Sequence, residues 1–226
     1  MKKFQGGSII INTKKFIRKV PLAESVYLKL KNRILEGIYL PGFHLVETDL
    51  TEEFHVSRVT IREALIRLAS DGLAVSTPNR GVMVRKLTQQ DLLDLYIIRE
   101  YLEGLSARLL TEQPDPNILQ ALKENLQEGE LLVSQQLHVE YRKNNNAFHR
   151  IIGHSSNNQY LVKSLDQLYT QLISLQFPGS FNQNIELSHM QHILIYKAIC
   201  TGAADAAEEA MRNHIRHAKQ LLSKHP

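Results

Sequence analysis

The spacing of apolar residues changes at Thr88, and this change limits the possible folds more than any other feature of the sequence. Before Thr88, short segments of both helical and alternating character are separated by Pro, Gly and Asn. After it, apolar residues recur every three or four positions, and no segment alternates with a period of two. We therefore predict a mostly α-helical chain in which a small mixed domain precedes an all-α antiparallel bundle.

The length of the chain suits two domains. Its 226 residues divide into a flexible lead over 1–20, a first domain over 21–87 and the bundle over 88–226. The single cysteine, Cys200, excludes an internal disulfide bond and a Cys-rich zinc module. No apolar run approaches the ~18 residues that a membrane span needs, and no secretory signal is readable. We therefore expect a cytoplasmic protein with no membrane partner.

The first domain has the order of elements of a winged helix-turn-helix. Two polar residues mark helix starts, because Thr48 is a candidate N-cap of the second helix and Ser57 of the third. The turn Pro78-Asn79-Arg80-Gly81 joins two β-prone segments into a hairpin. The predicted elements are helices over residues 22–38, 47–54 and 57–70 and strands over 73–77 and 82–85.

Positive charge is concentrated in this first domain. Residues 1–86 contain 15 Lys and Arg against 8 Asp and Glu, whereas residues 87–226 contain 12 against 15. A basic domain indicates a polyanion partner, with nucleic acid ahead of a membrane surface. On charge alone, an excess of positive charge that only keeps a small domain in solution is an equal alternative.

The third helix separates its residues into two faces. Its apolar residues share an inward face, which leaves Val59 and Arg62 outward and Arg58 and Thr60 in the exposed first turn. In a helix-turn-helix this turn enters the major groove, where Arg can pair with guanine and Val can contact a thymine methyl group. Arg80 at the hairpin tip is placed to reach a phosphate or the minor groove. Each arginine alone is better explained as a solvated charge, but together with the element order they favour binding of double-stranded DNA.

Three stretches of this domain carry a resemblance to a known family: "ILEGIYLPGFHLVETDL", "VSRVTIREALIRLASDGLA" and "PNRGVMV". They resemble the DNA-binding domain of the GntR family of bacterial transcription regulators. The family usually has Gly at the position of His55 in the turn. The resemblance implies that these residues lie at the operator: Arg58, Val59, Thr60, Arg62, Arg80 and Gly81. Because one reading helix covers few base pairs, we expect a homodimer on a pseudo-palindromic operator.

The bundle begins at a capping box formed by Thr88 and Asp91. The apolar stripe of its first helix runs through Leu92, Leu95, Leu102 and Leu105, with either Ile98 or Arg99 between them. The expected helices cover residues 88–110, 117–133, 136–152, 159–176, 186–200 and 205–222.

Eight of the ten histidines lie in the predicted bundle. On helical wheels three of them point inward from three different helices: His149, His192 and His214. His217 faces water, and His189 is ambiguous. One buried histidine is usually a hydrogen-bonded core residue, but three in one core each need a partner. A divalent metal ion satisfies all three, with Zn, Ni, Mn or Fe as candidates.

The bundle also resembles a known domain, on the stretches "IIREYLEGLSARLL", "N..FHRIIGHSSNNQYL" and "H..L..AICTGAADAAEEAMRNHI". These resemble the FCD ligand-sensing domain of the FadR-type branch of the GntR family. The resemblance implies a metal ion held by three His and an Asp or Asn: Asn145, His149, His192 and His214. The amide of Asn145, where the family often has Asp, leaves the site more positive and favours an anionic effector.

We expect this effector to be a small carboxylate or sugar acid bound in the bundle, and the protein to be a repressor. Arg99 is the candidate clamp for the carboxylate, and its pairing with Glu103 at i+4 is an equal alternative. Two other functions are a direct divalent-metal sensor and a histidine-ligated metalloenzyme. The enzyme is disfavoured because the sequence has no HExxH motif, no nucleophile elbow and no evident carboxylate beside the histidines.

Overall fold

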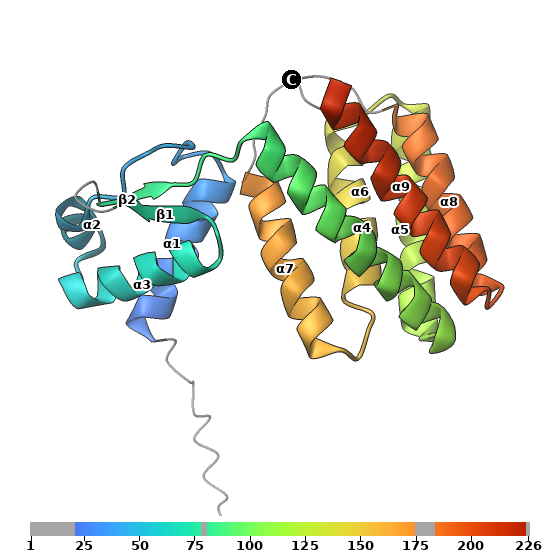
Figure 1. Cartoon of the computed structure of the whole chain (residues 1–226), viewed down its shortest axis with the longest axis horizontal. Coiled ribbons are helices and arrows are strands. Elements are labelled where there is room, and N and C mark those ends of the chain that lie inside the picture. The colour runs from blue at the N-terminus through green and yellow to red at the C-terminus, as the bar shows by residue number, and fades with distance from the viewer. Residues whose placement is uncertain (1–20, 78–80, 175–183, 225–226) are drawn as a thin grey trace, which may run out of the picture.

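The computed structural model of the chain describes residues 21–77, 81–174 and 184–224. It shows two lobes, a small one with a hairpin and a larger one built from helices alone (Figure 1). In the described part of the chain, the hairpin strands form the one sheet. The predicted mostly α-helical class is therefore confirmed, while the flexible lead predicted over residues 1–20 lies outside the described residues.

The small lobe is a winged helix-turn-helix, as predicted. Leu30 of the first helix, Ile61 and Leu68 of the third, and Leu73 before the hairpin are almost completely buried and form its core. The two strands are antiparallel, with Ala74 opposite Val84. The elements are α1 (Leu22–Leu35), α2 (Glu47–Phe54), α3 (Arg58–Ser70), β1 (Ala74–Thr77) and β2 (Gly81–Val84).

Two details of this lobe differ from the sequence predictions. Helix α1 ends at Leu35 because Gly37 adopts a φ of 75°, which leaves Ile38 outside the helix and 59% exposed. The N-cap of α2 is Val46, with no side-chain cap, and the hydroxyl of Thr48 instead contacts its neighbour Asp49. Ser57 caps α3 as predicted, through a 3.2 Å hydrogen bond from the backbone N–H of Thr60.

The large lobe is the predicted bundle. The hydroxyl of Thr88 accepts a hydrogen bond from the backbone N–H of Asp91, and the Asp91 carboxylate accepts one from the backbone N–H of Thr88. Within α4, Arg99 rather than Ile98 continues the buried face, and Leu105 lies outside it. The helices are α4 (Gln89–Glu112), α5 (Pro116–Ser134), α6 (His138–Gly153), α7 (Gln159–Ser174), α8 (Ile185–Cys200) and α9 (Ala204–Lys224).

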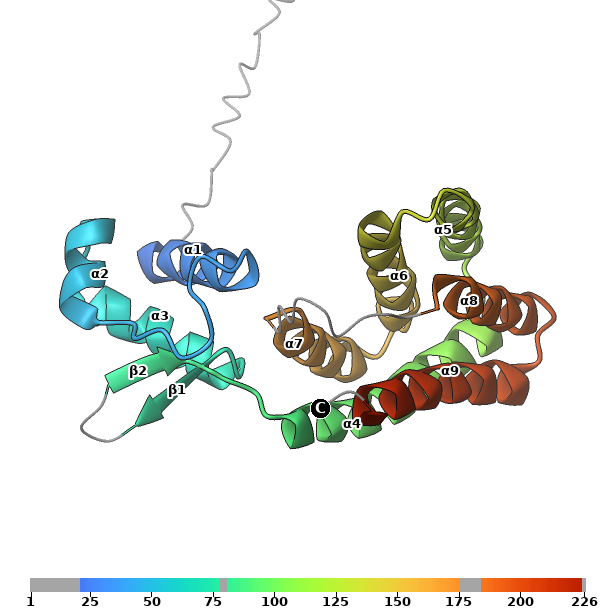
Figure 2. The same ribbon diagram turned by 90° about the horizontal axis from the view of Figure 1, so that it is seen from above.

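Helix α7 lies on the side of the bundle that faces the small lobe (Figures 1 and 2). Its Gln167 side chain donates a 2.9 Å hydrogen bond to the backbone carbonyl of Ser70, the last residue of α3. The side chain of Gln171 packs so closely on Gly72 that a Cβ there would lie 2.7 Å from it. Gly72 also has a φ of 75°, so both its backbone and its neighbour require glycine. The C-terminal end of the third helix therefore rests on α7.

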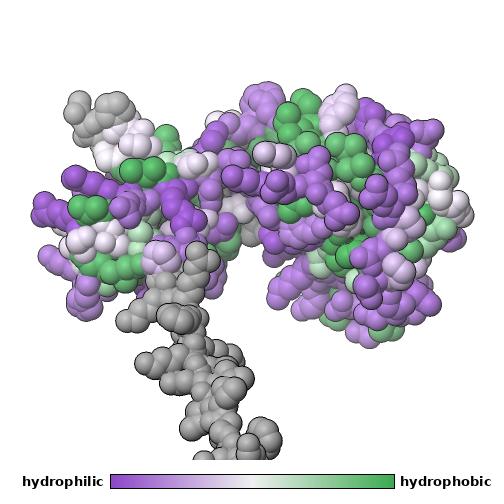
Figure 3. Space-filling view, turned by 90° about the horizontal axis from the view of Figure 1, so that it is seen from below, coloured by the Kyte–Doolittle hydropathy of each residue, from purple (hydrophilic) through white to green (hydrophobic). Residues whose placement is uncertain are grey.

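Seen from below, the surface is mostly hydrophilic, with hydrophobic residues scattered between polar ones on both lobes (Figure 3). None of the helices in the described ranges combines the length and apolar character that crossing a membrane requires.

The two threonines proposed as helix caps provide a matched test of the helix boundaries. Thr88→Ala should lower the free energy of unfolding by about 1 kcal/mol, because it removes half of a capping box. Thr48→Ala should leave this free energy unchanged or slightly higher, because the Thr48 hydroxyl caps no helix and alanine favours helix. Urea denaturation of both variants measures the difference. An equal loss in both would contradict the assigned start of α2.

Candidate metal centre and DNA-binding surface

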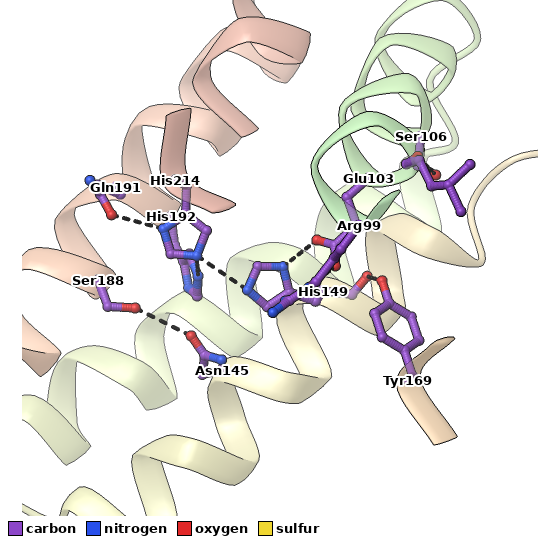
Figure 4. Close-up of polar contacts among 11 residues, drawn as sticks. Arg99, Glu103, Ser106, Asn145, His149, Tyr169, Ser188, Gln191, His192 and His214 are labelled. Carbon is purple, nitrogen blue, oxygen red and sulfur yellow. Dashed lines mark hydrogen bonds and ion pairs between the residues drawn. The ribbon is translucent and has the colours of Figure 1, made fainter. Parts of the chain in front are cut away.

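Three imidazoles meet in the core of the bundle, one from each of α6, α8 and α9 (Figure 4). The Nε2 atom of His214 lies 3.2 Å from Nε2 of His192 and 3.2 Å from Nε2 of His149. All three residues are buried, and one possible ligand atom from each lies within 4.8 Å of the others. The three histidines predicted to point inward are therefore the three that the fold brings together.

The hydrogen-bond partners of His149 and His214 outside the cluster determine which nitrogen of each ring carries the proton. Nδ1 of His149 is 2.5 Å from Oε2 of Glu103, and Nδ1 of His214 is 2.8 Å from Oε1 of Gln191. A carboxylate oxygen and an amide oxygen accept hydrogen bonds, so with these partners both Nδ1 atoms carry the proton. In the neutral rings, Nε2 of His149 and Nε2 of His214 are then both unprotonated, and their lone pairs face each other across 3.2 Å.

This arrangement fits a cation. Two facing lone pairs repel each other, whereas a divalent metal ion between them binds both. His192 can donate one N–H to His214, but its Nδ1 is buried without a hydrogen-bond partner among the described residues. Neutral imidazole nitrogens suit Zn, Ni, Mn or Fe, and the outer hydrogen bonds hold the rings in the ligating tautomer. The three histidines could therefore hold a metal ion.

Glu103 is the residue that sequence reasoning missed. Its side chain is 0% exposed, and its second oxygen accepts a 2.5 Å hydrogen bond from Nε of Arg99. The i+4 pairing between Arg99 and Glu103, which was the alternative to a carboxylate clamp, is thus present. The expectation that no carboxylate lies beside the histidines was wrong, because Glu103 bridges Arg99 and His149 across 46 residues of sequence. A helical wheel of α4 places Glu103 one turn after Arg99, which was the available signal.

Burial lowers the pKa of His149, although Glu103 opposes this effect. Burial and the neighbouring imidazoles hold the pKa values of His192 and His214 well below 6.5. Burial raises the pKa of Glu103, but Arg99 and His149 outweigh it and keep this carboxyl below its usual range. The site therefore consists of neutral rings and one ionised carboxylate at neutral pH, which is the protonation state that metal ligation needs.

The other predicted bundle residues lie close to this cluster. Asn145 is buried one turn before His149 in α6, and its Oδ1 accepts a 3.2 Å hydrogen bond from Ser188 (Figure 4). His217 is half-buried rather than fully exposed, and His189 is buried. A small groove of about 20 Å³ borders His214 between α8 and α9, and it is lined by Asn184, Leu187, Ser188, Gln191, His214, His217, Ala218 and Leu221.

The predicted DNA-contacting residues lie on the outer face of α3. Val59 is 64% exposed, and Arg58 and Arg62 are also exposed, whereas Thr60 is half-buried behind the Ser57 cap. The inward face is fully buried, as the wheel predicted. At the hairpin, Gly81 opens β2 with a φ of 76°, and Arg80 lies outside the described residues. The backbone at His55, where the resembling family usually has glycine, is left-handed with a φ of 52°.

Two models of known protein families match this chain. The model of the FCD domain matches residues 94–217, and the model of "Bacterial regulatory proteins, gntR family" matches residues 22–84. The chain belongs to the GntR family of bacterial transcription regulators. The families and relatives that match it are transcription regulators rather than enzymes. Membership of this family implies that the winged helix-turn-helix binds DNA.

Individual relatives match along most of their length. An uncharacterized HTH-type transcriptional regulator, YdhC of Bacillus subtilis (strain 168), is 29% identical over 90% of this chain and 92% of its own. The HTH-type transcriptional repressor RspR of Escherichia coli (strain K12) is 25% identical over 89% of each chain. The solved structure of E. coli McbR/YncC shares the fold, with a TM-score of 0.72 and 22% identity over 91% of this chain and 98% of that one.

The lowered histidine pKa values predict how stability depends on pH. In an unfolded chain histidine titrates near ~6.5, so below this pH the unfolded state binds protons that the folded core excludes. The stabilising contribution of the neutral rings is present above ~6.5 and is lost as the pH falls below it. The free energy of unfolding of metal-free protein should therefore decrease from pH 7 to about 5. His192→Leu should show a shallower decrease in urea denaturation at each pH, and an identical slope would contradict the assignment.

Proposed function

We propose that this GntR regulator is a homodimeric repressor whose affinity for operator DNA is controlled by a small anionic metabolite bound at a metal ion in the bundle. The observation that carries the proposal is the 3.2 Å approach of Nε2 of His149 to Nε2 of His214, in two rings whose Nδ1 atoms both contact hydrogen-bond acceptors. His192 and Asn145 complete the proposed ligand set. When bound, the ion supplies a positive centre with open positions that a carboxylate can occupy.

The surroundings of the site favour an anionic effector. The histidines and Asn145 carry no negative charge when neutral, so only Glu103 offsets the charge of an ion, and Glu103 is already paired with Arg99. The small groove between α8 and α9 borders His214, so a small acid that widens it would reach this ring. A small carboxylate or sugar acid is the class that fits these features, with Arg99 as the proposed second contact for its carboxylate.

Helix α7 provides a route from this site to the operator. The hydroxyl of Tyr169 donates a 3.1 Å hydrogen bond to the backbone carbonyl of His149. Two residues earlier on the same helix, Gln167 holds the carbonyl of Ser70 at the end of α3. A shift of His149 on ligand binding would move α7, and α7 would tilt the recognition helix. The short connection between β2 and α4 is a second, parallel route.

The outer face of α4 favours a homodimer. Ile98 is 54% exposed and Tyr101 is 57% exposed, and with Leu105 they form an apolar stripe at helical spacing. A second copy would cover this stripe and place two reading helices on one pseudo-palindromic operator. The repressor function is proposed from RspR, which carries that description.

A direct metal sensor is the alternative function, because the tautomers of His149 and His214 favour a metal ion and require no organic ligand. The two functions differ in what changes operator binding. For a sensor, adding the metal ion to metal-free protein is enough by itself to change operator binding. For the proposed function, the metal-loaded protein still responds to an organic acid.

The metal content of purified variants tests the proposed ligand set. The parent should contain about one divalent ion per chain, and His214→Ala should lose most of it, because His214 contacts both other rings. His217→Ala is the matched control from the same helix and should keep the metal. Elemental analysis after gel filtration measures both. Equal loss in the two variants, or no ion in the parent, would contradict the site.

The coupling between site and operator can be tested through Tyr169. Small organic acids are titrated into the metal-loaded protein while binding to a selected operator is followed, and an effective acid should change affinity by about 5- to 150-fold. Tyr169→Phe removes one hydroxyl, which also contacts Glu103, and should reduce this change by more than it weakens acid binding in calorimetry. Tyr160→Phe, an exposed tyrosine at the start of α7, is the control. Full coupling in Tyr169→Phe would exclude the route through α7.

A further inference from the structure

We propose that Glu47 of α2 is a specificity-determining residue that holds Arg62 in position to read a base and cancels its charge toward the phosphates. The inference rests on the proposed assignment of α3 as the recognition helix. Glu47 contacts no DNA-reading side chain other than Arg62 among the described residues. It would thus act through Arg62 and is a positioning residue.

The contact leaves one edge of the guanidinium free. Nε of Arg62 donates to both carboxylate oxygens of Glu47, at 2.9 Å each. Both Nη groups have no hydrogen-bond partner in the part of the chain that the structure describes, and the Arg62 side chain is 63% exposed against 34% for Glu47. The carboxylate therefore binds the Nε edge of the guanidinium and leaves the four N–H donors of its two Nη groups exposed to solvent.

Those outer donors match guanine. Its O6 and N7 atoms accept two parallel N–H groups in the major groove, and a guanidinium can supply them from its Nη edge while Nε remains bound. A free arginine loses side-chain freedom when it makes this pair, whereas an arginine already held by a carboxylate loses less. Glu47 would thus favour one direction of approach and one base.

Because of the ion pair, Arg62 can contribute to discrimination between bases without adding to the non-specific attraction between protein and DNA. Arg58, at the start of the same helix, has no ion pair among the described residues and keeps its full charge for a phosphate. The charge of Arg62 is balanced by Glu47, so Arg62 adds little to the release of counterions that drives non-specific binding. With the wrong base, the pair gains no hydrogen bonds and brings the negative charge of Glu47 near the duplex.

Glu47 can occupy this position because of the turn between α2 and α3. It is the first residue of α2, and the left-handed backbone of His55 folds α3 back beside α2. The contact spans 15 residues of sequence and joins the two helices at their DNA-facing side. No helical wheel of either element alone would pair these two residues.

The experiment compares Glu47→Gln with Glu63→Gln. Glu63 is an exposed carboxylate beside Arg62 in α3 that has no ion pair in the described ranges, so both variants remove one negative charge from the same surface. An operator is selected from random DNA with the full-length parent protein, and the guanine whose preference Arg62→Ala abolishes is identified. Binding to this operator, to its adenine-substituted form and to an unrelated duplex is then measured over a range of salt concentrations.

Opposite changes are expected in Glu47→Gln. Discrimination between the guanine and adenine operators should fall about tenfold, because Arg62 is no longer held. Binding to unrelated DNA should strengthen, and the slope of log K against log salt should steepen by about 0.9, because one charge is released toward a phosphate. Glu63→Gln should strengthen unrelated binding without loss of discrimination.

Three results would overturn the inference. Parental discrimination in Glu47→Gln would show that Arg62 reads its base unaided. A loss of affinity for all three duplexes with a shallower salt slope would assign Glu47 a structural role only. If Arg62→Ala leaves every guanine preference intact, the recognition-helix assignment fails together with the inference, whereas the first two results leave that assignment standing.

Discussion

The hydrogen bond between His149 and the buried carboxylate of Glu103 determines what the bundle core can bind. It places the proton of His149 on Nδ1 and turns the lone pair of Nε2 toward His214. Arg99 makes the buried carboxylate tolerable by pairing with its other oxygen. Without this anion the three rings could share their protons and form an ordinary hydrogen-bonded core, so the chemistry of the site depends on a residue that is not itself a proposed ligand.

The same physical arrangement recurs in the small lobe. In the core, Glu103 accepts a hydrogen bond from one ring nitrogen of a histidine and leaves the other nitrogen available to a ligand. On α3, Glu47 takes up Nε of Arg62 and leaves the Nη edge available. In both places a carboxylate fixes the direction in which a nitrogen-bearing group faces a partner. Helix α7 lies between the two places and makes hydrogen bonds toward each, through Tyr169 and Gln167.

The sequence was sufficient for the features that depend on one helix and insufficient for those that depend on two. Periodicity and candidate cap residues together predicted every described helix, and periodicity gave the inward direction of His149, His192 and His214, because burial of one face repeats along a helix. The end of α1 required the left-handed backbone of Gly37, and the missed Glu103 contact joins helices far apart in sequence. Such pairings arise only when the elements pack.

The central claim is the protonation pattern of the three rings, and nitrogen NMR of histidine side chains in the metal-free protein tests it most directly. The account predicts that His149 and His214 both carry the proton on Nδ1 with Nε2 bare at neutral pH, and that addition of Zn²⁺ shifts the Nε2 signals of all three rings. A proton on Nε2 of either His149 or His214, or Nε2 signals that do not change when the metal is added, would contradict the account.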